Sequence, residues 1–301
     1  MAIEYRNKNM ILKTSTKDCV KILAPAKINL FLQVLSKRRD GYHNINSLMQ
    51  AVTLFDKLGF KKINESVCKV KLVNKNESEI TDNLIVKTYN LIKKQFGLRR
   101  GLAVTLEKRI PIAAGLGGGS SDCAATIMAL NQLFALSLSQ EQMLEIGMQL
   151  GSDVPFFFSK GQALVTGRGE AVRETHYPIK YKIVLVSPPL AFSTKSGYAA
   201  LKMNLTSNGT PFNLRKDRNL EDFFVSLSQA GNDFEKVQFK KHPELGAIKE
   251  KLVNCGARFA RMSGSGPSIF GVFEHTFDTE CVRANNFSGC QLYTVDPFCL
   301  P

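Results

Sequence analysis

The sequence lacks the residue patterns that mark zinc-binding, disulfide-rich and membrane-spanning proteins. Its seven cysteines include no C-x-x-C pair and no cluster with histidine, which argues against a zinc site or a disulfide framework and favours a reducing compartment. No apolar run approaches the ~18 residues that a membrane span requires. The first twenty residues have no apolar core of a secretory signal. We therefore expect a cytoplasmic protein with no membrane partner. A trimmed transit peptide stays open, with the plastid stroma as the less favoured location.

Acidic residues are also scarce relative to basic ones. The chain of 301 residues has 26 Asp and Glu against 40 Lys and Arg, a net charge of +14. Such an excess can serve nucleic acid, a membrane surface or an anionic small molecule. Because the basic residues are scattered and form no long tract, we interpret them as solvated surface and predict no nucleic-acid partner. The length allows one large or two modest domains.

A glycine-rich stretch, residues 111–122, organises the chain. It reads Pro-Ile-Ala-Ala-Gly-Leu-Gly-Gly-Gly-Ser-Ser-Asp. A strand-like run, 102–106, precedes it, and an apolar helix-like run, 123–136, follows, with Ser120 and Ser121 as the expected N-caps. Glycine lets backbone N–H groups approach an anion, and a helix N-terminus adds positive potential. On glycine content alone a tight turn is an equal alternative, but the order of the neighbours favours a phosphate site.

This stretch carries no lysine of its own. It lacks the G-x-x-x-x-G-K-[ST] pattern of a Walker A loop, and its spacing differs from the G-x-G-x-x-G of dinucleotide-binding folds. If the stretch binds a nucleotide, the cation that faces the phosphates must come from elsewhere in the chain.

Residues 21–35 alternate between apolar and polar side chains, which predicts a strand. The alternation assigns one face to Ile28, Leu30, Leu32 and Val34, and the other to Lys27, Asn29, Phe31 and Gln33. Lys27 and Asn29 side by side are either part of a solvent-facing surface or part of a site.

Further periodic segments alternate between strand and helix character. We expect strands at 47–60, 67–73, 102–106, 162–166, 183–186 and 269–273, and helices at 83–96 (capped by Asp82), 140–149 (with a capping box from Ser139), 220–227 and 243–254. Residues 167–170 predict a hairpin turn. The composition shift after Pro188 predicts a domain boundary near 160–185 and a mobile segment at 202–217. This mixture favours an α+β fold over a regular βαβ array.

Three separated motifs together resemble the GHMP kinase superfamily. They are Pro25-Ala26-Lys27-Ile28-Asn29, the glycine-rich stretch 111–121, and Ser263-Gly264-Ser265-Gly266. The segments 40–43 (Asp-Gly-Tyr-His), 82–84 (Asp-Asn-Leu) and 151–157 (Gly-Ser-Asp-Val-Pro-Phe-Phe) are most similar to the superfamily members of the non-mevalonate isoprenoid pathway, whose alcohol substrate is CDP-methylerythritol. The resemblance extends from about residue 22 to 275.

The resemblance implies a two-domain α+β fold with the active site in the cleft between the halves. Residues 1–20 would be an N-terminal extension. Residues 21–175 would form an ATP-binding half like ribosomal S5 domain 2, and residues 176–301 a ferredoxin-like half. It also implies transfer of the ATP γ-phosphoryl group to the 2-hydroxyl of the cytidyl substrate, by a monomer or homodimer that binds these small molecules.

The resemblance assigns roles to individual residues. Asp153 would be the general base and Lys27 would stabilise charge beside it. Asn29, Tyr42, His43, Thr194 and Tyr198 would bind the substrate, with Tyr42 and Tyr198 stacking on the cytosine and His43 bonding its edge. The ATP phosphates would contact Pro111, Ile112, Ala113, Ala114, Gly115, Leu116, Gly117, Gly118, Gly119, Ser120 and Ser121. Mg²⁺ would be held mainly by the nucleotide, with no dedicated metal site and Ser121 as a candidate contact.

Asp122 departs from the family pattern, in which asparagine is more usual after the double serine. A carboxylate beside phosphates costs repulsion unless it points away or meets Mg²⁺. The N-terminal extension and the tail after about 285 have no counterpart in the resemblance.

Other functions remain open at this point. A GHMP kinase acting on mevalonate, homoserine or a sugar would have no use for the Asp-Gly-Tyr-His segment. A non-catalytic ligand sensor on the same fold would lack Lys27 or Asp153, and both are present. A nucleic-acid binder would bind generic DNA or RNA in a salt-sensitive way.

Overall fold

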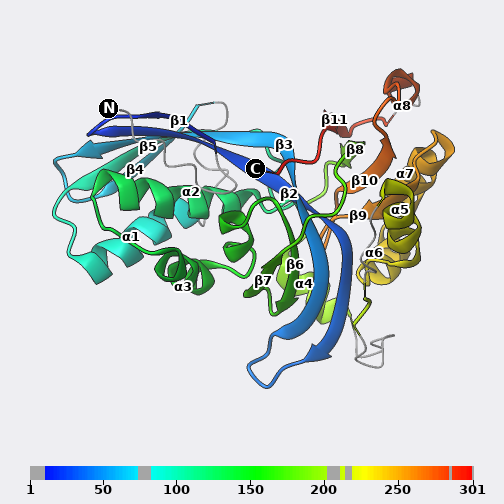
Figure 1. The fold of residues 1–301 in the computed structure, drawn as a ribbon, viewed down its shortest axis with the longest axis horizontal. Coiled ribbons are helices and arrows are strands. Elements are labelled where there is room, and N and C mark those ends of the chain that lie inside the picture. Colours follow the sequence, from blue (N-terminus) through cyan, green and yellow to red (C-terminus); the bar gives the residue numbers. More distant parts are fainter. Residues whose placement is uncertain (1–10, 74–82, 202–210, 214–218, 285–286, 300–301) are drawn as a thin grey trace.

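Two β-sheets and the helices packed on them make up the molecule (Figure 1). The computed structural model describes residues 11–73, 83–201, 211–213, 219–284 and 287–299. The larger sheet belongs to the N-terminal half and the smaller one to the C-terminal half, which confirms the predicted α+β class.

The larger sheet has seven strands, and two of them are long enough to reach the other half. Its strands are β1 (Ile11–Ser15), β2 (Cys19–Lys37), β3 (His43–Ile63), β4 (Cys68–Leu72), β5 (Gly101–Glu107), β6 (Gln162–Gly167) and β7 (Ala171–Glu174). The order is β1-β2-β3-β5-β4, and β6 pairs with β3 and β7. Strand β3 therefore forks: residues 57–63 pair with β5 and residues 45–50 pair with β6.

Helices α1 (Leu84–Phe96), α2 (Gly118–Leu133) and α3 (Gln140–Leu150) cover one face of the larger sheet (Figure 1). The capping box of Ser139 at α3 is confirmed. The predicted cap Asp82 lies outside the described residues, and the N-cap of α1 is Asn83, whose side chain accepts a hydrogen bond from Ile85 N.

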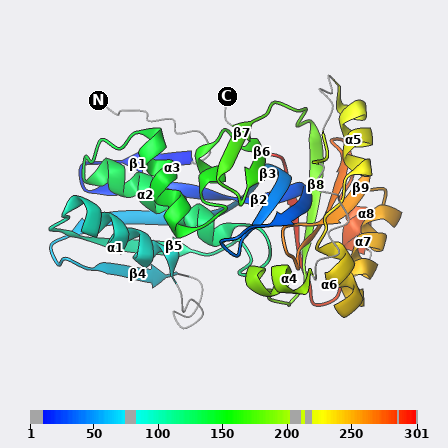
Figure 2. The same ribbon diagram turned by 90° about the horizontal axis from the view of Figure 1, so that it is seen from below.

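The smaller sheet confirms the predicted ferredoxin-like half. Strands β8 (Tyr181–Ser187), β9 (Phe259–Met262), β10 (Ile269–Glu274) and β11 (Gln291–Val295) are antiparallel in the order β11-β8-β10-β9. This is the strand order of the split β-α-β unit. The helices of this half are α4 (Thr194–Ala200), α5 (Leu220–Gln229), α6 (Glu235–Lys241), α7 (Pro243–Asn254) and α8 (Glu280–Ala284). Helices α5, α6 and α7 cover the face turned away from the N-terminal half (Figure 2).

A β-bulge in β2 changes the expected alternation of side chains. The pairing of β2 with β3 shifts between Asn29 and Phe31, and an extra residue at a bulge moves the following side chains to the other face. Phe31 consequently packs in the same apolar cluster as Leu30, while Leu32 packs in a different one. The predicted assignment of residues 28–34 to two strict faces is therefore wrong beyond residue 30.

Both described ends of the chain bond to the larger sheet. Residues 11–15 of the predicted N-terminal extension form the edge strand β1, which pairs with β2. Near the other end, Phe298 N donates to Ala51 O, so the chain after β11 returns to β3. Most of the segment predicted to be mobile, 202–210 and 214–217, lies outside the described residues. The domain boundary between 175 and 176 stays a prediction.

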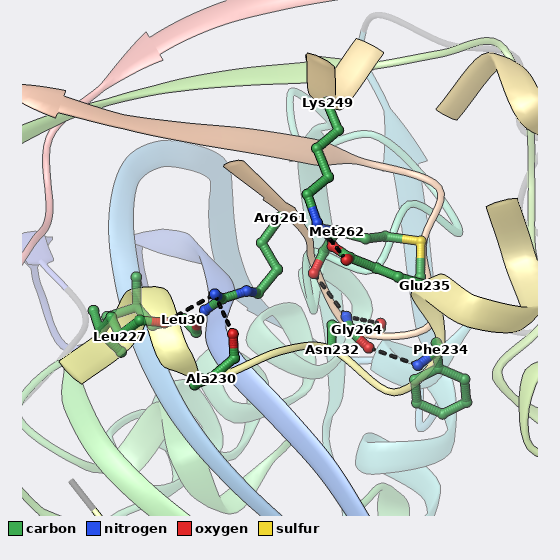
Figure 3. A network of polar contacts seen from close by, with 10 residues as sticks. All are labelled: Leu30, Leu227, Ala230, Asn232, Phe234, Glu235, Lys249, Arg261, Met262 and Gly264. Carbon is green, nitrogen blue, oxygen red and sulfur yellow. Dashed lines mark hydrogen bonds and ion pairs between the residues drawn. The ribbon is translucent and has the colours of Figure 1, made fainter. Parts of the chain in front are cut away.

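A buried arginine joins the two halves (Figure 3). Arg261 in β9 is 3% exposed and donates to Leu30 O on β2, as well as to Leu227 O at 2.9 Å and Ala230 O at 2.5 Å at the end of α5. Burial lowers the pKa of Arg261 to about 10, and the nearby Glu235 opposes this effect, so the guanidinium remains charged at neutral pH. One side chain thus satisfies three carbonyl groups from both halves.

The same region holds the second Gly/Ser loop. Asn232 Nδ2 donates to Met262 O at 2.7 Å and to Gly264 O at 2.8 Å, and Glu235 accepts from Met262 N at 2.8 Å (Figure 3). Asn232 Oδ1 accepts from Phe234 N. These bonds determine where the loop 263–266 lies relative to β2.

We expect Arg261→Leu to lower the free energy of unfolding by about 4 kcal/mol, because it leaves three buried carbonyl groups without a donor. Chemical denaturation of the purified protein measures the loss. The exposed Arg99 provides the control, since Arg99→Leu should change the stability by no more than about 0.5 kcal/mol. Equal stabilities of the two variants would contradict the role given to Arg261.

Candidate active site

A cavity of about 450 Å³ lies between the two halves. The N-terminal half contributes the β2 residues Lys27 and Asn29, the glycine-rich loop, and Asp153. The C-terminal half contributes Phe192, Thr194, Tyr198, Phe234, Gly264 and Ser265. The wall therefore combines all three motifs of the sequence analysis.

The glycine-rich loop wraps one side of this cavity. All residues from Pro111 to Ser120 line it. Gly115 and Gly117 have positive φ angles of 78° and 69°, and a Cβ on Gly115 would lie 2.1 Å from Ser263 O. Only glycine fits there, because a side chain would collide with the second Gly/Ser loop.

Helix α2 begins earlier than predicted. Its N-cap is Gly117, and no side chain caps it, so the prediction of Ser120 and Ser121 as N-caps is wrong. The glycines themselves form the first turn, and the free N–H groups of that turn belong to cavity-lining residues. This arrangement suits an anion such as a phosphate. Ser121 is fully buried and does not line the cavity, because it lies one residue beyond Ser120 on the helix and takes a different direction.

Lys27 and Asp153 form an ion pair in the cavity wall. The distance from Lys27 Nζ to Asp153 Oδ2 is 3.3 Å, and the side chains are 3% and 32% exposed. Lys27 Nζ also donates to Asn29 Oδ1 at 2.7 Å. Both β2 side chains are buried, so the interpretation of a solvent-facing surface is excluded. Asp153 lies two positions before a 3₁₀ turn, Pro155–Phe158, whose aromatic side chains are buried.

Two serines hold Asn29 in place, and the sequence analysis assigned neither of them to this task. Asn29 Nδ2 donates to Ser47 Oγ at 2.9 Å, and Ser47 Oγ donates to Phe31 O at 2.6 Å. Asn29 N donates to Ser263 Oγ at 3.3 Å, and Ser263 Oγ donates to Gly115 O at 2.9 Å. Ser263 therefore connects the β2 strand to both Gly/Ser loops. The sequence signal for this contact was that Ser263 belongs to the motif Ser263-Gly264-Ser265-Gly266.

A second buried lysine lies under the glycine-rich loop, and the sequence analysis missed it. Lys108 Nζ bonds Asp56 Oδ2 and, at 2.9 Å, Asp122 Oδ2. Asp56 Oδ1 accepts from Arg109 N at 2.6 Å and Ile110 N at 2.9 Å. Lys108 and Asp122 line the cavity. Asp122 therefore meets the ammonium of Lys108, a partner that the sequence analysis did not consider when it named Mg²⁺.

The surroundings of Asp122 change its titration. Burial raises the pKa of Asp122 to about 7, the Lys108 ammonium opposes the rise, and the nearby Asp56 carboxylate adds to it. Burial lowers the pKa of Lys108, but the carboxylates of Asp122 and Asp56 together outweigh burial, so the pKa is raised.

The predicted base clamp is only partly assembled. Thr194 and Tyr198 line the cavity, whereas Tyr42 and His43 do not. The rings of His43 and Tyr198 stack at 4.8 Å and 16°, so His43 supports Tyr198 from behind the wall. Tyr42 is 50% exposed and its ring faces the guanidinium of Arg168. The stacking of Tyr42 and Tyr198 on the cytosine stays a prediction, and in this structure the Tyr42 ring contacts the guanidinium of Arg168.

Burial lowers the pKa of His43, and the nearby Lys37 adds to the effect. The neutral imidazole that results carries one donor and one acceptor. Burial also raises the pKa of Tyr198, with a contribution from Asp153.

No group of three His, Cys, Asp or Glu side chains that could hold a metal ion occurs in the described ranges. The two carboxylates in the cavity wall, Asp122 and Asp153, are each paired with a lysine ammonium, so a Mg²⁺ that arrives on the nucleotide would be held by phosphate oxygens and water. The contact of Ser121 with this ion stays a prediction. None of the helices in the described part of the chain has the length and apolar content needed to cross a membrane.

Comparisons with known proteins agree in both halves of the chain. Residues 83–161 match the model of the GHMP kinases N terminal domain, and residues 214–285 match that of the GHMP kinases C terminal domain. A 4-diphosphocytidyl-2-C-methyl-D-erythritol kinase of Syntrophus aciditrophicus (strain SB) is 40% identical over 85% of this chain and 90% of its own length. The enzyme of that name from Bacillus cereus (strain AH187) is 38% identical over 84% and 88%.

Solved structures give the same result. A crystal structure of 4-(cytidine 5'-diphospho)-2C-methyl-D-erythritol kinase matches with a TM-score of 0.72 and 30% identity, over 92% of this chain and 99% of that one. The mevalonate kinase of Methanococcus jannaschii matches with a TM-score of 0.70 but only 16% identity, over 92% and 98%. The second likeness concerns the fold alone.

We expect the stability difference between the unsubstituted protein and Asp122→Asn to depend on pH. The pKa of Asp122 is higher in the folded protein, about 7, than its ordinary value of 3.8, so the folded state binds this proton more tightly. The resulting stabilisation is fully present below about pH 4 and is lost as the pH rises through about 7. Denaturation from pH 4 to pH 8 should show the unsubstituted protein losing stability relative to Asp122→Asn. A difference that stays constant over this range would contradict the raised pKa.

Proposed function

Given that this chain belongs to the 4-diphosphocytidyl-2-C-methyl-D-erythritol kinase family of the GHMP kinases, we propose that it transfers the γ-phosphoryl group of ATP to the 2-hydroxyl of 4-diphosphocytidyl-2-C-methyl-D-erythritol. Family membership confirms the resemblance seen in the three motifs, and the chain is a kinase. The observation that supports the reaction best is the Lys27–Asp153 ion pair in a cavity lined by the glycine-rich loop.

The N–H groups of residues 112–120 hold the ATP phosphates, with the N-terminus of α2 directed at them. When bound, Mg²⁺ neutralises charge on the phosphate oxygens. The second Gly/Ser loop packs against Gly115 through Ser263 and keeps the first loop in this conformation.

Asp153 accepts the proton of the substrate hydroxyl as its oxygen attacks the γ-phosphorus. The new O–P bond forms while the bond from that phosphorus to the β-phosphate bridging oxygen breaks, and ADP leaves. Lys27 lies 3.3 Å from Asp153, so its ammonium pairs with the carboxylate and stabilises charge on the transferring group. Asn29 holds the ammonium in place and orients the alcohol.

The cytidine end of the substrate contacts Thr194 and the ring of Tyr198, with His43 stacked behind that ring. Tyr42 would have to leave Arg168 to take part. We keep the cytoplasm as the location, because ATP is abundant there and all seven cysteines are free thiols. Monomer and homodimer both stay open, with no nucleic-acid partner.

The purified protein should form ADP from Mg-ATP in the presence of CDP-methylerythritol. A coupled enzyme assay with ATP in excess measures it, with mevalonate and homoserine as alternative alcohols. Because the Tyr198 wall suits an aromatic base, only the cytidyl alcohol should support turnover at micromolar concentration. Faster turnover of mevalonate or homoserine than of CDP-methylerythritol would contradict the proposed substrate and support one of the other GHMP kinase activities.

The variant Asp153→Asn tests the role of Asp153 as the general base. Loss of the proton acceptor should lower kcat about a thousandfold, while the affinity for ATP measured by calorimetry stays the same. Full activity of this variant would exclude Asp153 as the base.

We expect His43→Ala to raise KM for the cytidyl alcohol about tenfold, because Tyr198 loses the ring that supports it. The KM for ATP should not change, since His43 is not part of the nucleotide wall. Steady-state kinetics with each substrate varied in turn separates the two constants. The exposed His176 serves as the control, and His176→Ala should leave both constants as they are. A parallel rise of both KM values in His43→Ala would point to a general structural defect.

A further inference from the structure

The lysine that the glycine-rich loop lacks is present beneath it as Lys108. Lys108 directly follows β5, and two residues separate it from the start of the loop at Pro111. Its Nζ lies so close to Gly118 that a Cβ on that glycine would be only 3.1 Å away. Lys108 lines the same cavity as the loop. Its positive charge therefore acts on whatever the loop binds.

Two carboxylates share this one ammonium. Asp56 and Asp122 both bond Lys108 Nζ, so the three ionised side chains sum to a charge of −1. Without Asp122 the sum would be zero. The three groups come from β3, from the entry to the loop, and from α2, so this buried cluster holds both ends of the phosphate loop.

The two carboxylates are engaged to different degrees. Asp56 uses both oxygens, one for Lys108 and one for the N–H groups of Arg109 and Ile110. Asp122 uses only Oδ2, and its buried Oδ1 has no hydrogen-bond partner among the described residues. The Asp122 side chain also lies near Asp56, which repels it. A neutral asparagine could accept the same bond from Lys108 without this repulsion.

The hydrogen bond from Lys108 to Asp122 therefore does not require a negative charge on residue 122. We look for the role of that charge in its effect on other groups nearby. Asp122 is only 4% exposed and lines the cavity in which the proposed function puts the ATP phosphates. In a buried, poorly screened position, one negative charge near several phosphate charges changes their binding appreciably.

We propose that Asp122 is an affinity-setting residue, whose carboxylate offsets the charge of Lys108 beneath the glycine-rich loop and weakens the binding of nucleotide phosphates. This inference rests on the proposed function, because it requires that the loop binds a nucleotide. Asp122 acts through Lys108 and the local potential. Weaker binding of phosphates favours release of ADP after transfer.

The test is calorimetric titration of Asp122→Asn with ADP, Mg-ATP and adenosine at pH 8. Removing the charge should tighten the binding of ADP and Mg-ATP about tenfold. The affinity for adenosine should not change, because adenosine carries no phosphate. A purely structural role for Asp122 would alter all three affinities together, so the dependence on phosphate distinguishes the two.

Two further variants complete the experiment. Asp122→Ala makes the same change in charge without the amide, and it should tighten ADP binding as well. Asp18→Asn removes a carboxylate that pairs with Lys62 and Arg100 outside the cavity, and it should leave all three affinities unchanged. Thermal unfolding of each variant verifies that it folds.

Unchanged or weaker binding of ADP to Asp122→Asn would overturn the inference. Weaker nucleotide binding that is seen only when Mg²⁺ is present would indicate that Asp122 contacts the metal ion and does not set the phosphate affinity. Failure of both Asp122 variants to fold would show that the carboxylate is required for the fold, which also overturns it. No nucleotide binding by the unsubstituted protein would overturn the proposed function together with this inference, whereas the other outcomes concern Asp122 alone.

Discussion

The buried ammonium of Lys27 is the constraint around which the two halves are arranged. A lysine that is 3% exposed is costly unless its charge is paired and its protons are bonded. Asn29 on the same strand supplies one acceptor, and Asp153, from a segment more than a hundred residues later, supplies the opposite charge. The fold must therefore bring the turn after α3 against β2. This requirement places a carboxylate and an ammonium together at one wall of the cavity.

The C-terminal half completes that wall and fixes its geometry. Ser263 binds the backbone of Asn29 and reaches the glycine-rich loop at Gly115. Arg261, two residues earlier, bonds the carbonyl of Leu30 just past the catalytic segment. Asn232 and Glu235 hold the loop between them from the other side. The cavity is thus bounded by elements that are distant in sequence but joined through a few buried polar side chains.

Much of the fold and part of the site could be predicted from the sequence, because glycine spacing and apolar periodicity are local signals. The phosphate loop, the capping box of Ser139 and the three motifs are of this kind. The bulge after Asn29 could not be predicted, since it depends on how β2 pairs with β3. The cluster of Asp56, Lys108 and Asp122 was missed for a similar reason, because its members come from β3, the segment after β5 and helix α2, and only the folded chain brings them together. The contact of the Tyr42 ring with the guanidinium of Arg168 could not be predicted either, because the two residues are more than a hundred positions apart.

The central claim is that the cavity transfers a phosphoryl group to an alcohol and does not merely hydrolyse ATP. Phosphorus NMR of the protein with Mg-ATP and CDP-methylerythritol tests this most directly, because it follows both the donor and the acceptor. The account predicts one new phosphomonoester resonance that grows in step with ADP, while the diphosphate bridge of the cytidyl compound stays intact. Inorganic phosphate in place of the new ester would contradict it.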